Sequence, residues 1–196
     1  MINSKNVIPI VGIHGWKGNR ESFRLIADLF KLENAEWIIP QAPYKVKENQ
    51  YTWAKEIEEG RYEVRDSIQY LNHFFNDEVL KKYDPTDVHV IGFSQGAATC
   101  YEFVLKMPFQ FAGVYPIAGF LRDFKSGRPI LHEKQRKTPI FIGHGISDEI
   151  VPVESSKTIF EMLKKESKKV EIILYNGGHK ISMSYIKTIK NYILNT

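Results

Sequence analysis

Residues 92–96 read Gly-Phe-Ser-Gln-Gly and place a serine between two glycines in the pattern G-x-S-x-G. This pattern is typical of a nucleophile elbow, a sharp strand-to-helix turn that exposes a serine hydroxyl above a sheet. The glycines are needed because a turn this tight leaves no room for neighbouring side chains. Residues 88–91 before the motif are strand-like, and residues 97–105 after it are helix-like. We therefore expect Ser94 to act as the nucleophile of an acyl-transfer reaction.

A serine hydroxyl needs a base within hydrogen-bond reach, and the base needs an acid to orient it. Behind a nucleophile elbow these partners follow the serine in the order acid, then histidine. Only His179 follows Ser94, the fifth expected strand and a candidate acid. We expect His179 to be the base and Asp148 the acid. Asp123 is the alternative acid, and Glu149 is a neighbour that could take the place of Asp148.

Acyl transfer also requires N–H donors for the oxyanion of the tetrahedral intermediate. The backbone N–H of Gln95, at the start of a helix, is one candidate. The second should come from the loop after the first strand, where Gly15 allows close approach and Trp16 supplies an N–H. We expect Trp16 and Gln95 to form the oxyanion hole.

The other histidines that precede or follow the motif have plainer interpretations. His14 ends the first expected strand and is expected to order its loop by hydrogen bonding. His89 and His144 are interpreted as structural, and the single cysteine, Cys100, as a small core residue.

The elements that must position these residues alternate between short apolar runs and segments of helical period, which is typical of βαβ units on a parallel sheet. Ligands bind such sheets at the carboxyl ends of the strands, where the candidate residues lie. We predict an α/β fold with a mostly parallel central sheet of six or seven strands, helices on both faces and no large cap domain. The visible strands are residues 7–13, 36–39, 88–91, 111–117, 139–143 and 170–174. The first expected helix begins near residue 19 or 22. Four more are expected over residues 62–82, 95–106, 154–165 and 183–194.

Two longer irregular stretches, residues 40–60 and 116–138, are expected to shape the substrate site, because long loops in compact domains are often functional. They carry aromatic side chains that favour acyl or aryl groups over highly charged ones. The expected pocket wall consists of Trp16, Tyr44, Trp53, Phe93 and Phe120.

Length and composition limit the remaining classes. The chain has 196 residues, of which 43% are hydrophobic and 26% charged, as expected for one globular domain over residues 1–196. Its net charge of +4 invites a nucleic-acid hypothesis, but the densest basic run, residues 164–169, is better explained as a helix end. No apolar run is long enough for a membrane span, and one cysteine indicates a reducing, cytoplasmic setting.

The motifs together resemble the phospholipase/carboxylesterase family of α/β-hydrolases, which includes the acyl-protein thioesterases. The resemblance covers nearly the whole chain. It rests on the five segments His-Gly-Trp at 14–16, Gly-Phe-Ser-Gln-Gly at 92–96, Ile-Ala-Gly-Phe-Leu at 117–121, His144-Gly145 with Asp148 and Val151-Pro152, and Gly178-His179.

The resemblance implies a serine hydrolase that cleaves carboxylic esters or thioesters through an acyl-enzyme. It implies no cofactor and no metal, with Ser94, Asp148 and His179 as the triad and the Trp16 and Gln95 amides as the oxyanion hole. The expected partner is a small-molecule acyl ester or thioester substrate. Neither a nucleic-acid partner nor a membrane span is expected, and a homodimer is left open. The alternatives are an acyl-protein thioesterase or lysophospholipase, a peptidase or lactone hydrolase, and a non-catalytic homologue that binds a small ligand.

Overall fold

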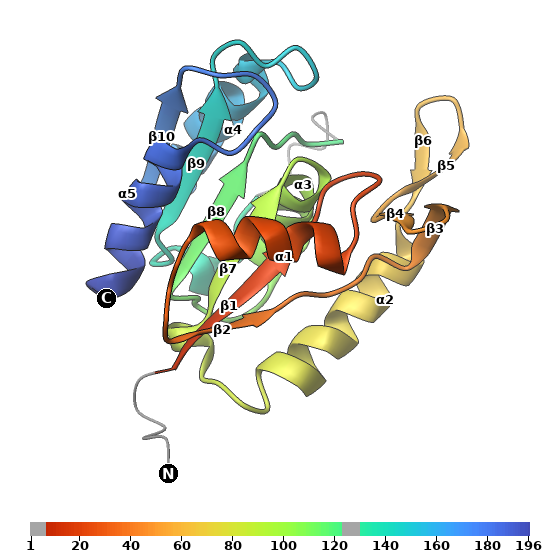
Figure 1. Ribbon diagram of the computed structural model, residues 1–196. Coiled ribbons are helices and arrows are strands. Elements are labelled where there is room, and N and C mark those ends of the chain that lie inside the picture. The colour runs from red at the N-terminus through yellow and green to blue at the C-terminus, as the bar shows by residue number, and fades with distance from the viewer. Residues whose placement is uncertain (1–6, 123–129) are drawn as a thin grey trace.

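The computed structural model describes residues 7–122 and 130–196. Its centre is a six-stranded sheet in the order β10-β9-β8-β7-β1-β2, and every neighbouring pair is parallel (Figure 1). The strands are β1 (Ile8–Ile13), β2 (Ala35–Ile38), β7 (His89–Phe93), β8 (Gly113–Ile117), β9 (Ile140–Gly145) and β10 (Val170–Tyr175). The predicted sheet of six or seven strands is confirmed and has six. The inner strands β1, β7, β8 and β9 are almost wholly buried and therefore read as apolar runs, whereas the edge strands β2 and β10 are partly exposed.

The strand that precedes the serine is longer than expected. β7 continues through Gly92 and Phe93, which pair with Pro116 and Ile117 of β8. The sequence predicted an end at residue 91, because the glycine of the motif looked like the start of the turn. The serine therefore follows the last residue of the strand directly.

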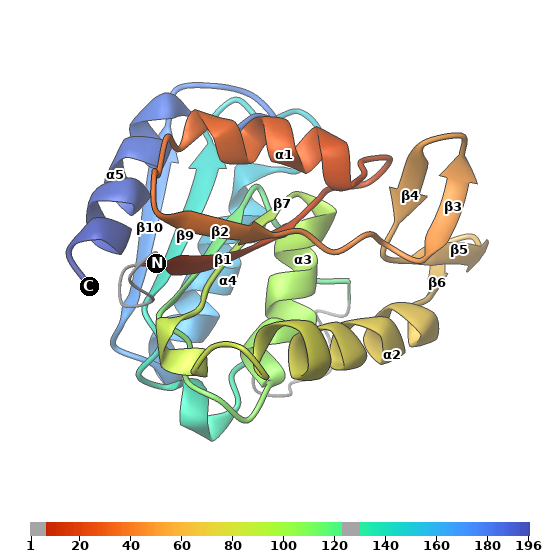
Figure 2. The same ribbon diagram turned by 60° about the horizontal axis from the view of Figure 1, so that its bottom comes forward.

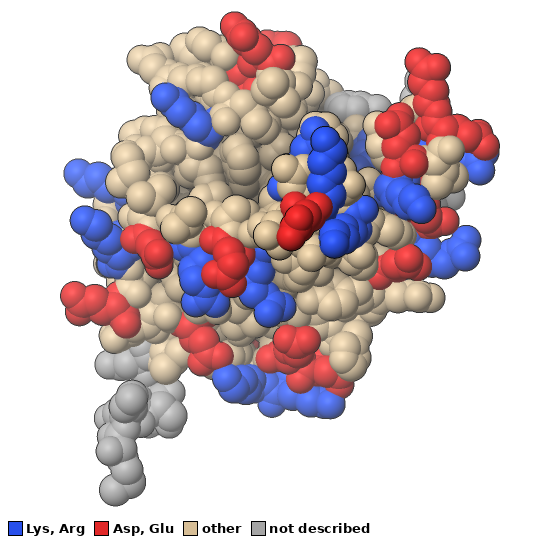
Figure 3. Space-filling view, turned by 45° about the vertical axis from the view of Figure 1, so that its right-hand side comes forward, with Lys and Arg blue, Asp and Glu red and all other residues tan. Residues whose placement is uncertain are grey.

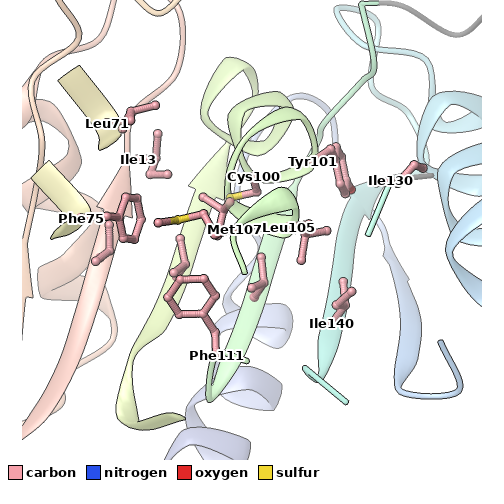
Figure 4. Packing of buried hydrophobic residues seen from close by; sticks show 14 of the residues in the cluster. Ile13, Leu71, Phe75, Cys100, Tyr101, Leu105, Met107, Phe111, Ile130 and Ile140 are labelled. Carbon is pink, nitrogen blue, oxygen red and sulfur yellow. The ribbon is translucent and has the colours of Figure 1, made fainter. Parts of the chain in front are cut away.

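The side chains of the strands alternate between two hydrophobic cores, one on each face of the sheet. In β9, for example, Ile140 and Ile142 join one core and Phe141 joins the other. The first core is packed against helices α2, α3 and α4, and the second against α1 and α5; Figures 1 and 2 show this division of the helices. Figure 4 shows how Cys100 and Tyr101 of α3 lie within the first core.

The helices are α1 (Arg20–Leu29), α2 (Arg65–His73), α3 (Gln95–Glu102), α4 (Val153–Glu166) and α5 (Met183–Leu194). Asn19 caps α1 through a capping box with Ser22, so the helix begins at the first of the two predicted positions. The predicted helix over 62–82 begins only at Arg65, continues as a π-helical segment over Phe74–Val79, and leaves Ile68 44% exposed. The predicted helix over 95–106 ends at Glu102 and continues as a short 3-10 turn over Val104–Lys106.

Most of the segment expected to be an irregular loop, residues 40–60, forms two antiparallel hairpins. The first joins β3 (Tyr44–Lys47) to β4 (Gln50–Thr52), and the second joins β5 (Lys55–Glu58) to β6 (Arg61–Glu63). Figures 1 and 2 show both hairpins together at one end of the molecule, away from both chain termini. These strands are three or four residues long and mostly exposed, so they offer no extended buried face from which a strand could be predicted.

The surface carries charges of both signs. On the face shown in Figure 3, Lys and Arg side chains are interspersed with Asp and Glu. No helix within residues 7–122 and 130–196 is both long enough and apolar enough to cross a bilayer.

Candidate active site

Ser94 occupies a sharp turn between β7 and α3. Its backbone has φ 56° and ψ −115°, a conformation that side-chain-bearing residues rarely adopt. The flanking glycines allow this turn, because a Cβ on Gly96 would lie 2.0 Å from the carbonyl oxygen of Ile13 and one on Gly92 would lie 2.4 Å from that of Gly96. Side chains at these two positions would therefore push α3 away from β1 and open the turn.

His179 approaches the serine from the loop between β10 and α5. Its Nε2 lies 2.9 Å from Ser94 Oγ, across a sequence separation of 85 residues. The loop is held in place by the Tyr175 hydroxyl, which donates to the carbonyl of Lys180 at 2.6 Å. The ring of His179 also packs against Phe93, with 5.0 Å between ring centroids.

Asp148 lies on the other side of the His179 ring, and its side chain is fully buried. Nδ1 of His179 lies 2.7 Å from Asp148 Oδ2, while the backbone amides of Ile150 and Val151 each donate to Oδ1 at 2.9 Å. Burial raises the pKa of Asp148. The hydrogen bonds from the Val151 amide, the His179 ring and the Ile150 amide lower it by more, so the pKa lies below its ordinary value. An ionised carboxylate accepts and cannot donate, so the His179 proton resides on Nδ1 and leaves Nε2 free to accept from Ser94.

The loop after β1 lies against the serine. A Cβ on Gly15 would be 3.3 Å from the Cβ of Ser94. The loop therefore touches the serine turn at Gly15, and the amide of Trp16 is the next one along the chain. Gln95 is the first residue of α3, where helix N–H groups have no partner within the helix. The two backbone segments that the sequence nominated as oxyanion donors thus meet beside Ser94.

His14 orders this loop, as expected. Its Nδ1 donates to the carbonyl of Gly15 at 2.8 Å, and its Nε2 accepts from the amide of Ala42 at 3.1 Å. Burial lowers the pKa of His14 to about 4, although the bond to Gly15 opposes the shift. The ring is therefore neutral at physiological pH and is a structural support for the loop.

Trp53 differs from its expected place in the pocket wall. Its side chain is only 1% exposed, and its indole N–H donates to the carbonyl of His14 at 2.9 Å. It therefore supports the loop of Trp16 from behind. An aromatic residue in an irregular segment carries no periodicity to show which way it faces, so its sequence position alone could not place it.

The side chain of Gln95 connects the elbow to the hairpins. Its Oε1 accepts from the amide of Trp53 at 2.9 Å, and its Nε2 donates to Oγ1 of Thr52 at 2.8 Å. The Thr52 hydroxyl in turn donates to the carbonyl of Ala54 at 2.9 Å. Thr52 could not be identified from the sequence, because a threonine between two aromatic residues carries no motif.

A cavity of about 1030 Å³ begins beside the elbow, at Trp16 and Gln95, and extends between the hairpins and α3. Of the expected pocket residues, Trp16, Tyr44 and Phe120 line it, whereas Trp53 and Phe93 do not. The cavity has further apolar lining that was not expected, namely Val46, Val64, Ile68, Leu121, Ile130 and Met162. The sequence pattern assigned these side chains either to the buried face of a helix or to no element.

Charged side chains also line the cavity. Arg122 pairs with Glu102 through Nη1 and through its backbone amide, and both side chains are largely buried. Lys106, on the turn that follows α3, lines the cavity as well. The cavity therefore combines apolar and charged lining, and Lys45, Lys55, Glu56 and Arg61 of the hairpins add further charges.

The acid in contact with His179 is Asp148, and the two alternatives expected from the sequence were Glu149 and Asp123. Glu149 is exposed and follows Asp148 at the surface, while Asp123 lies outside the described residues. In the described part of the chain, no group of three or more His, Cys, Asp and Glu side chains is arranged to hold a metal ion.

The sequence matches known proteins along almost its entire length. A family model described as Phospholipase/Carboxylesterase matches residues 4–196. Carboxylesterase SOBER1 of Arabidopsis thaliana is 27% identical over 203 residues, which cover 94% of this chain and 88% of that protein. Acyl-protein thioesterase 1 of Kluyveromyces lactis is 26% identical over 178 residues, which cover 81% of this chain and 77% of that protein.

Solved structures show the same architecture. The crystal structure of Arabidopsis thaliana SOBER1 aligns with a TM-score of 0.79 at 26% identity, covering 95% of this chain and 97% of that chain. Zea mays acyl-protein thioesterase 2 aligns with a TM-score of 0.72 at 21% identity, covering 97% and 94%. The predicted α/β-hydrolase fold is confirmed by these alignments and by the parallel sheet with helices on both faces.

Proposed function

The chain belongs to the phospholipase/carboxylesterase family and is a carboxylic ester hydrolase, and we propose that it works as a serine hydrolase. The observation that carries the proposal is the chain of contacts from Ser94 Oγ to His179 Nε2 at 2.9 Å and from His179 Nδ1 to Asp148 Oδ2 at 2.7 Å. The first distance allows a proton to pass from the nucleophile to the base, and the second is that of a hydrogen bond that orients the base.

The first half of the reaction acylates the enzyme. Ser94 Oγ attacks the carbonyl carbon of the ester while His179 Nε2 takes the hydroxyl proton. Asp148, through its contact with Nδ1, stabilises the imidazolium that forms. As the tetrahedral intermediate collapses, the bond to the leaving group breaks and the leaving group takes the proton from Nε2.

The second half releases the acid. Water attacks the acyl carbon and gives its proton to His179, the bond to Ser94 Oγ breaks, and the serine recovers a proton from Nε2. In both halves the amides of Gln95 and Trp16 stabilise the oxyanion. The close contact of Gly15 with Ser94 supports this assignment, because it brings the loop of Trp16 to the reacting carbonyl.

The substrate is a carboxylic ester or thioester with an apolar acyl group. Trp16 and Phe120 at the near end of the cavity favour such a group, and the volume of about 1030 Å³ leaves room for a chain longer than acetyl. The family match over residues 4–196 supports one catalytic domain spanning the chain.

A series of p-nitrophenyl esters from acetate to palmitate tests the proposal, with Ser94→Ala as the paired control and the matching thioesters as a second series. We expect turnover that Ser94→Ala loses, together with labelling of the parent protein by a fluorophosphonate probe. Turnover that survives Ser94→Ala would overturn the serine mechanism. Absence of both turnover and labelling in the parent protein would favour a ligand-binding homologue, and a preference for thioesters would favour acyl-protein thioesterase activity.

A further inference from the structure

His144 lies in β9, four residues before Asp148, and its side chain is fully buried. Its ring contacts three groups. Nδ1 lies 2.6 Å from the hydroxyl of Ser156 in α4, and Nε2 lies 2.9 Å from the carbonyl oxygen of Val151 and 3.3 Å from Asp148 Oδ2. One ring thus contacts the helix, the end of the Asp148 loop and the Asp148 carboxylate itself.

The neighbours of this ring decide which nitrogen carries the proton. The Val151 carbonyl and the Asp148 carboxylate are acceptors only, so Nε2 must be the donor. Nδ1 then accepts from the Ser156 hydroxyl. The positive end of the Nε2–H dipole lies beside the carboxylate, where it favours the ionised form.

Val151 links this ring to Asp148 a second time. Its N–H donates to Asp148 Oδ1 at 2.9 Å, while its carbonyl accepts from His144. The loop that carries Asp148 is therefore tied at its far end to the strand from which it started. Ser156 holds the ring from the opposite side and so limits its rotation.

We propose that His144 is a positioning residue for Asp148, holding the carboxylate and its loop in the orientation that His179 requires. This inference rests on the proposed function of Ser94, His179 and Asp148. His144 does not line the cavity. Its removal should therefore slow the chemical step and leave substrate binding unchanged.

The test compares two substitutions of His144 with a matched control. His144→Leu removes the donor, whereas His144→Gln places an amide N–H near the position of Nε2. His89→Leu is the control, because His89 is also a buried histidine in the central sheet but contacts Tyr115, far from the serine. For each variant we would measure kcat and KM for p-nitrophenyl acetate, together with the melting temperature.

We expect His144→Leu to lower kcat by about tenfold to a hundredfold, since small misplacements of catalytic groups have effects of this size, with KM unchanged. His144→Gln should recover most of kcat, and His89→Leu should lower the melting temperature while keeping kcat. Equal kcat in His144→Leu and the parent, equal losses in the Leu and Gln variants, or an equal loss in His89→Leu would each overturn the inference. Loss of turnover in Ser94→Ala alongside an unaffected His144→Leu would leave the serine mechanism standing.

A measurement on the parent protein covers the case in which His144→Leu does not fold. Nitrogen-15 NMR of the histidine side chains reports which ring nitrogen is protonated. We expect His144 to carry its proton on Nε2 at neutral pH. A proton on Nδ1 alone would leave no donor facing Val151 and Asp148, and would overturn the inference.

Discussion

The indole N–H of Trp53 donates to the carbonyl of His14 at 2.9 Å and so joins the end of the first hairpin to the loop that follows β1. We predict that Trp53→Phe lowers the free energy of unfolding by about 1–3 kcal/mol, because it leaves a buried carbonyl without its donor. It should also lower kcat, since the same loop carries Trp16. Urea denaturation and ester kinetics measure both effects. Trp37→Phe is the control, because Trp37 packs on the opposite face against Phe30, and an equal fall in kcat there would contradict the prediction.

Replacing Asp148 by Asn keeps the shape of the side chain and removes its charge. We predict a fall in kcat of about four orders of magnitude at neutral pH, because His179 then loses the partner that fixes its tautomer and stabilises its charged form. Glu149→Gln removes an acidic charge from the exposed neighbouring position and should leave kcat unchanged. Ester kinetics under saturating substrate distinguish the two, and equal activities would assign the acid to another residue.

The stability of the fold should fall in acid because of its buried histidines. Burial lowers the pKa of His89 to about 4 from 6.5, so the unfolded chain binds a proton in this interval that the folded chain does not. The stabilisation is complete above pH 6.5 and is lost as the pH falls toward 4, by about 3 kcal/mol for one such group. His89→Leu should therefore flatten the pH dependence of the free energy of unfolding over this interval. An unchanged slope would mean that His89 does not titrate in this way.

The glycine after the nucleophile should tolerate no side chain. We predict that Gly96→Ala lowers the free energy of unfolding by several kcal/mol, since its Cβ would meet the backbone of Ile13 at 2.0 Å. Gly60→Ala is the comparison, because nothing lies within 4 Å of its added Cβ and only its φ of 73° opposes the change. That substitution should have an effect of about 1–2 kcal/mol. Thermal unfolding measures both, and similar values would contradict the packing of α3 against β1.

The cavity should determine the preferred acyl chain. We predict that Phe120→Ala lowers kcat/KM more for the longer p-nitrophenyl esters than for the acetate, because it removes apolar contact with the chain. Leu25→Ala is the control, since Leu25 is 70% exposed on α1 and does not line the cavity. An unchanged chain-length profile in Phe120→Ala would remove this residue from the substrate site.

The sequence predicted the fold well where burial imposes a simple pattern. The inner strands of the sheet are apolar because both of their faces are covered. Ser94 could be placed because its tight turn leaves no room for side chains at the flanking glycines. The hairpins escaped prediction because a strand such as Lys55–Glu58 is exposed along its whole length. Trp53 and Thr52 escaped because their partners, His14 and Gln95, are about 40 residues away and no local pattern encodes such a contact.

Gln95 takes part in two parts of the structure at once. Its backbone begins the helix beside Ser94, while its side chain holds Thr52 and Trp53 at the end of the first hairpin. In the proposed function, Gln95 therefore links the oxyanion hole to the hairpins that line the cavity. New acyl specificities should arise more readily through changes in the hairpin tips than through changes at their base, where each substitution is also a substitution in the machinery that breaks the ester.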